Sequence, residues 1–128
     1  MNAKKIVFWI ATVLFAGFML FSAYSYLTRD PKMMAAFASL GYPSYFPIIL
    51  GVAKLLGAIT LLLPGLPRLK EWAYAGFTFT LLGAFFSHLA SGQSPQAAMP
   101  AIFLVVVAIS YGLRPYRYLV TDPIVIVA

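Results

Sequence analysis

The stretch that decides the fold covers residues 45–63 and reads YFPIILGVAKLLGAITLLL. It is long enough to cross a bilayer, which takes about 20 apolar residues in a helix. Its one charged residue, Lys54, stands at the middle, where a charge costs about 3 kcal/mol on insertion scales. Lys54 is therefore the first candidate for a functional residue. The alternative is that Lys54 extends along the helix or pairs with a neighbouring helix to fix the bundle.

The composition of the whole chain is that of an integral membrane protein. Of its 128 residues 62% are hydrophobic and 9% are charged, against about 25% charged residues in soluble proteins. Cysteine is absent and there is one histidine, so the sequence predicts no metal site and no intrinsic cofactor. The net charge is +6, but the basic residues occur in ones and twos beside apolar runs. We therefore expect no nucleic-acid partner.

The apolar stretches predict an all-α membrane protein with four crossings. The first stretch follows two lysines, as a secretory signal would, but it lacks a small-x-small cleavage site and is interpreted as retained. The connection at 64–70 is so short that the second and third helices must form an antiparallel hairpin. We predict one domain over residues 1–128, an antiparallel four-transmembrane-helix bundle with spans at about 6–27, 45–63, 72–90 and 97–113.

The basic residues also predict the orientation of the chain. Cytoplasmic loops carry an excess of lysine and arginine, and six basic residues fall on one side of the predicted bundle against two on the other. We therefore expect a protein of the bacterial cytoplasmic (inner) membrane with both termini in the cytoplasm. The cytoplasmic group is Lys4, Lys5, Arg68, Lys70, Arg114 and Arg117, and the outer group is Arg29 and Lys32.

A short amphipathic helix is predicted on the outer side, at about 31–40. Asp30 can cap its start, Pro31 suits its first position, and Gly41 can end it. One face then carries Met33, Met34, Phe37 and Leu40. Such a helix either anchors the chain at the membrane surface or forms a lid over the bundle.

Polar residues on the predicted spans suggest a ligand site inside the bundle. Small residues lie close to Lys54 on the same face of its helix. Because small residues mark the face on which helices pack in lipid, we expect Lys54 to point into the bundle interior. A desolvated lysine can hold an anionic or carbonyl-bearing ligand, and quinones fit a pocket of aromatic and polar residues. The sequence does not decide whether Lys54 forms an ion pair with Glu71. The candidate ligand-binding residues are Lys54, Tyr74, Glu71, His88, Thr78 and Tyr42.

Several short motifs resemble the DoxX-like family of small four-helix membrane proteins. They are LGYP at 40–43, KLLGA at 54–58 followed by Pro64, KEWAYAGF at 70–77, Ser87-His88 and SYGLRP at 110–115. The resemblance extends from about residue 5 to residue 115, and KEWAYAGF is its most specific part. The family pattern falls on Gly41, Tyr42, Pro43, Lys54, Gly57, Glu71, Trp72, Ala73, Tyr74, Gly76 and His88.

The resemblance implies two kinds of function. Proteins similar in this way include membrane subunits linked to thiosulfate:quinone oxidoreduction and partners of oxidative-stress enzymes, while similar vertebrate proteins assist assembly of ion-channel receptors. The first hypothesis is thus a membrane subunit of a redox system that binds a quinone-like or lipid ligand. The second is a non-catalytic assembly factor, chaperone or lipid-binding protein. No catalytic residue is assigned, and the expected partners are the lipid bilayer, a redox or client membrane protein, and a second copy in a homo-oligomer.

Overall fold

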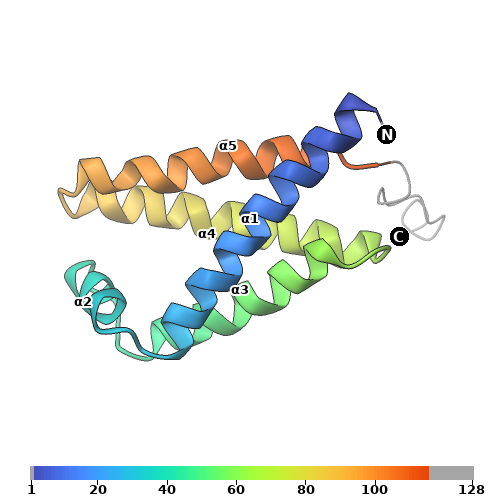
Figure 1. Cartoon of the computed structure of the whole chain (residues 1–128). Helices are drawn as coiled ribbons and strands as arrows, with labels where there is room; N and C mark the ends of the chain where they lie inside the picture. Colours follow the sequence, from blue (N-terminus) through green and yellow to red (C-terminus); the bar gives the residue numbers. More distant parts are fainter. Residues whose placement is uncertain (1, 116–128) are drawn as a thin grey trace, which may run out of the picture.

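The computed structural model describes residues 2–115, and within that range every regular element is a helix. Arg117, which entered the orientation argument, and the tail after it lie outside the described residues. The elements follow one another along the chain as coloured in Figure 1: α1 (Ala3–Leu27), α2 (Pro31–Ser39), α3 (Phe46–Leu62), α4 (Pro67–Ala90), the 3-10 helix η1 (Ser94–Ala97) and α5 (Ala98–Gly112).

Three of these segments are long and apolar enough to cross a membrane. They are α1, α4 and the continuous segment Ser94–Gly112, while α3 is a shorter apolar helix. The prediction of an all-helical membrane protein is therefore confirmed for the described residues. The predicted third span, 72–90, lies within a longer helix, because α4 already begins at Pro67 after a left-handed Leu66 with φ 56°. The motif KEWAYAGF thus lies wholly inside α4 rather than partly in a connection.

The four long helices form two closely packed pairs that also contact each other. In Figure 1, α3 runs back along α1, and α5 runs back along α4. The core between them includes Phe15 and Met19 of α1, Leu61 of α3 and Phe77 of α4. α3 and α4 meet at their short connection and separate toward the opposite end, where α2 lies. The two helices therefore diverge from their connection toward the end that carries α2.

Close packing of α1 on α3 depends on a glycine. A Cβ atom added at Gly51 would come within 2.9 Å of Leu27 Cγ and 3.2 Å of Tyr26 Cβ. Small residues allow helix backbones to approach in lipid, where no hydrophobic effect drives them together. Gly51 therefore brings α3 against the end of α1 that carries Tyr26.

The predicted amphipathic helix is confirmed as α2. The Asp30 side chain accepts a hydrogen bond of 3.3 Å from the backbone N–H of Met33, and Gly41 has a φ of +86° beyond the helix end. The predicted apolar face is half-buried, whereas the other α2 residues are exposed. Phe37 on that face packs edge-to-face on Tyr26, with ring centroids 5.1 Å apart. α2 is thus held against the bundle.

Candidate functional site

Lys54 lies in the interior of the described structure, with 9% of its surface exposed. Its Nζ donates hydrogen bonds to Ser22 Oγ at 2.9 Å and to Tyr26 Oη at 3.0 Å. The same nitrogen lies 4.2 Å from the centroid of the Tyr26 ring, a cation–π distance. Both partners belong to α1, so the close approach at Gly51 brings them within reach of Lys54. All of these partners are neutral.

The pair between Lys54 and Glu71 that the sequence left open does not form. Glu71 accepts a hydrogen bond from Arg114 at 2.6 Å and another from the Tyr111 hydroxyl at 2.9 Å. Among residues 2–115 no carboxylate lies within ion-pair distance of Lys54. The ammonium of Lys54 is therefore buried without a counter-ion in this part of the chain.

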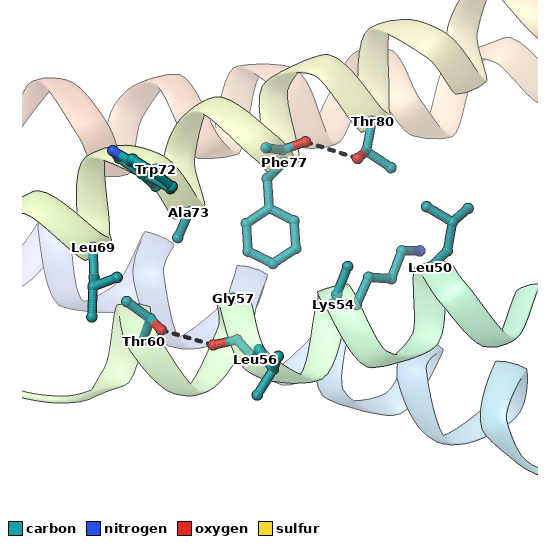
Figure 2. Close-up of a pocket in the computed structure, with 12 residues that line it drawn as sticks. Leu50, Lys54, Leu56, Gly57, Thr60, Leu69, Trp72, Ala73, Phe77 and Thr80 are labelled. Atoms are coloured by element: carbon teal, nitrogen blue, oxygen red, sulfur yellow. Dashed lines mark hydrogen bonds between the residues drawn. The ribbon is translucent and has the colours of Figure 1, made fainter.

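Lys54 also borders a groove of about 290 Å³ between α3 and α4. Figure 2 shows the Phe77 ring pointing from α4 toward Gly57 on α3, and the Lys54 side chain extending on the side of Leu50 and Thr80. A Cβ at Gly57 would lie 2.8 Å from the Phe77 ring, so this glycine makes room for the ring. The groove is lined by Leu50, Ala53, Lys54, Leu56, Gly57, Thr60, Leu69, Trp72, Ala73, Gly76, Phe77 and Thr80.

The groove is predominantly apolar and opens toward the outside of the bundle. Trp72 on its rim is 79% exposed. The Thr60 and Thr80 hydroxyls donate to carbonyls of their own helices, those of Leu56 and Gly76. Lys54 is the one ionisable side chain among the lining residues. The groove therefore has one charged hydrogen-bond donor, the Lys54 ammonium, on a surface that is otherwise mainly apolar.

Two of the predicted site residues lie elsewhere on α4: Tyr74 belongs to a buried hydroxyl cluster that joins three helices, and Thr78 lies outside that cluster. The Tyr74 hydroxyl is 2.7 Å from Ser110 Oγ, which is 2.6 Å from Thr12 Oγ1. Thr78 donates its hydroxyl proton to the Tyr74 carbonyl of its own helix at 2.7 Å. Neither Tyr74 nor Thr78 lines the groove. The Tyr74 hydroxyl joins α4 to α5 and, through Ser110, to α1, whereas the Thr78 hydrogen bond stays within α4.

Two further predicted residues lie at the end of the bundle that carries α2. The Tyr42 hydroxyl is 2.5 Å from Ser87 Oγ. His88 Nδ1 is hydrogen-bonded to Gln93 Oε1 at 3.0 Å, and Gln93 Nε2 donates to Ser39 Oγ at 3.2 Å. These contacts fasten α2 and its following loop to α4. The structure therefore does not bring the six predicted residues together in one pocket: they fall into separate groups, and Lys54 alone of them borders the groove.

Sequence reasoning also missed the role of Lys70, which it counted as a loop charge. Lys70 is only 2% exposed. Its Nζ donates to the carbonyl oxygens of Thr60 at 2.6 Å, Leu61 at 3.3 Å and also Leu63. The last carbonyls of a helix lack intrahelical partners and attract cations. Lys70 on α4 therefore caps the C-terminal end of α3. The sequence signal that could have predicted this cap is a lysine that follows soon after an apolar helix.

Comparison with known proteins supports a family assignment and gives no closer relative. No curated protein and no solved structure matched the chain. A family model described as the DoxX-like family matches residues 10–110, which is most of the sequence and includes the core of α1, the groove and nearly all of α5. The chain belongs to the DoxX-like family.

Proposed function

We propose that all four long helices cross the bilayer as an antiparallel bundle, with both termini in the cytoplasm of a bacterial cell. The 17 residues of α3 rise about 26 Å, a little less than the roughly 30 Å of the hydrocarbon core. The ends of the described chain, where Lys4 and Arg114 lie, and the α3–α4 connection gather at one end of the bundle (Figure 1). Arg29 and Lys32 flank the other end. The buried Lys70 no longer counts as a surface charge, yet the bias keeps its direction.

The bundle then functions as a receptor for a membrane-soluble ligand, quinone-like or lipid, in the groove between α3 and α4. The observation that carries this proposal is the buried ammonium of Lys54 at the edge of an apolar groove, with no carboxylate near it among the described residues. Charged residues at membrane depth are costly and mark binding sites or transport paths. Lys54 would donate a hydrogen bond to a carbonyl or acid oxygen of the ligand head.

The size and walls of the groove suit such a ligand. A volume of about 290 Å³ is at the lower end of the range for small-molecule sites. It holds one ring or one chain rather than a lipid with two chains. A tail can leave through the open side into the bilayer beside Trp72. A partner protein would supply electrons to a bound quinone, and this chain would be the membrane subunit of the redox system.

A second candidate function is recognition of a client membrane protein. The outward face of α4 carries Trp72, Phe79 and Phe86 at intervals of seven residues, and they are 79%, 74% and 61% exposed. Aromatic residues are enriched at protein interfaces. This face would let the chain act as an assembly factor without any small ligand.

Purification from native membranes in a mild detergent, followed by mass spectrometry of lipids and proteins, separates these functions. A quinone or single-chain lipid that co-purifies with the wild-type protein and is lost from the Lys54→Met variant supports the ligand receptor. A stoichiometric membrane protein, with no small molecule that depends on Lys54, supports the assembly factor and overturns the ligand proposal.

A further inference from the structure

We infer that the groove selects an anionic, single-chain amphiphile, such as a long-chain carboxylate, over neutral ligands of the same shape. This inference rests on the proposed ligand-binding function and narrows its ligand class. It follows from the charge around Lys54, the hydrogen-bond donors that meet there, and the size and polarity of the rest of the groove.

The charge balance within the described chain leaves Lys54 uncompensated. The sequence has three acidic residues. Glu71 is paired with Arg114, Asp30 caps α2, and Asp122 lies outside the described residues. A buried charge is tolerated when it is paired and hydrogen-bonded. A neutral carbonyl would satisfy one N–H of the ammonium but leave its charge unbalanced, whereas a carboxylate would do both.

The donors around Lys54 match an anion. An ammonium has three N–H donors, and two of them point to Ser22 and Tyr26. No partner for the third lies among residues 2–115. The two hydroxyls accept from Lys54 and still have their own protons to donate. A carboxylate at this position can accept from the ammonium and from a reoriented hydroxyl, and such charge-assisted hydrogen bonds are the strong ones.

The remainder of the groove is suited to a hydrocarbon chain. From Lys54 to Thr60 along α3 it extends about 9 Å by helix rise. The hydroxyl protons of Thr60 and Thr80 are already donated to their own helices. Polar recognition is therefore confined to Lys54 and its two neighbours, and an amphiphile with its acid group at Lys54 would leave only methylenes against the other walls.

The indole of Trp72 provides a direct readout of occupancy. The chain has two tryptophans, so Trp9→Phe leaves Trp72, on the groove rim, as the only indole fluorophore. We would titrate this protein, in a nonionic detergent at a pH where the acid is ionised, with dibromostearate and with its methyl ester. Bromine quenches indole on contact, and displacement by unbrominated oleate or by a decyl benzoquinone isolates the saturable, specific part of the quenching.

The variants separate a specific contact from general attraction to a basic protein. Lys54→Met and Lys32→Met each remove one positive charge, but Lys32 lies on the exposed side of α2. We expect the wild-type groove to bind the acid about tenfold or more tightly than the ester, as for a hydrogen bond to a charged group. Lys32→Met and Lys54→Arg should keep this preference and Lys54→Met should lose it.

Each remaining outcome is decisive. Equal binding of acid, ester and quinone by the Trp9→Phe protein, in which Lys54 is intact, would overturn the inference and leave the ligand receptor standing. A preference for acid that survives in Lys54→Met would also overturn the inference. Quenching that neither oleate nor the quinone can displace would overturn both the inference and the proposed function.

Discussion

The ammonium of Lys70 in α4 donates a hydrogen bond of 2.6 Å to the backbone carbonyl of Thr60 in α3, across the connection of the two helices. Further bonds to the carbonyls of Leu61 and Leu63 complete the cap. The contact lies at the end of the bundle where α3 and α4 meet, and Thr60 itself lines the groove. Lys70 therefore holds the point from which α3 and α4 diverge.

Replacing Lys70 with methionine should destabilise the bundle. Methionine keeps most of the apolar stem but leaves the last carbonyls of α3 without this donor. A buried acceptor that loses its partner costs about 1–3 kcal/mol. Thermal unfolding in detergent would measure the effect, with Lys4→Met, at an exposed lysine near the start of α1, as the control. Equal unfolding temperatures for the two variants would show that the cap contributes nothing.

The two glycines that face the groove should respond to alanine in opposite directions. At Gly57 a new Cβ would meet the Phe77 ring at 2.8 Å, and that ring is itself held against Phe15 at 5.0 Å between centroids. Overpacking of this kind costs about 1–3 kcal/mol. At Gly76 a Cβ would meet nothing within 4 Å, so helix propensity should make alanine stabilising by up to about 1 kcal/mol.

Unfolding in detergent compares the variants Gly57→Ala and Gly76→Ala directly. The same Gly57→Ala protein should bind the groove ligand differently, because Phe77 must shift where it faces the groove. A Gly57→Ala protein as stable as Gly76→Ala would mean that Phe77 has room to move and that Gly57 does not set its position.

The membrane class and the helix caps were predictable because they depend on local sequence. Apolar length predicts a span, and Asp30, Pro31 and Gly41 set the limits of α2 whatever packs around it. Helix starts are harder to predict. α4 begins before its apolar stretch because Pro67 is suited to a first turn, and charged residues are tolerated in that turn.

The partners of the predicted site residues could not be derived from the sequence, because contacts between helices depend on how the helices are rotated and how they cross. Polar residues on different spans were predicted to share one ligand site, although a sequence does not give the rotation of each helix. Tyr74 instead faces Ser110, and Glu71 faces Arg114. The partners of Lys54, Ser22 and Tyr26, are ordinary polar residues on another helix. Their role appears only when the packing of α1 on α3 is known.

The attachment of α2 can be tested through its buried face. Replacing Met34 and Phe37 together with serine removes the apolar contacts with the bundle, including the ring contact of Phe37 with Tyr26. Amide exchange over residues 31–40 should become faster while the long helices keep their protection. The exposed pair Ala35→Ser and Ala38→Ser is the control. If the first double variant fails to insert, α2 is part of the folding core rather than a cover.

The proposed orientation can be tested because the chain contains no cysteine. Position 70 is unsuitable for labelling because Lys70 is buried, so we choose the exposed positions of Arg68 and Ser94. An impermeant thiol reagent added to intact cells should label a cysteine at 94 and not one at 68. Both should react after the membrane is opened. Labelling at 68 alone in intact cells would reverse the topology.

The stability of the Lys54→Met variant distinguishes a binding role from a structural one. Ser22 and Tyr26 are neutral, so removing the ammonium leaves no opposite charge unpaired among the described residues. We expect the ligand-free variant to be as stable as the wild type or more stable, since replacing a buried charge by an apolar group is often neutral or favourable. Loss of a structural ion pair would instead cost about 3–5 kcal/mol. Thermal unfolding in detergent, with and without oleate and the decyl benzoquinone, gives both quantities. A strongly destabilised ligand-free variant, or one that keeps the full wild-type shift with ligand, would contradict a binding role for Lys54.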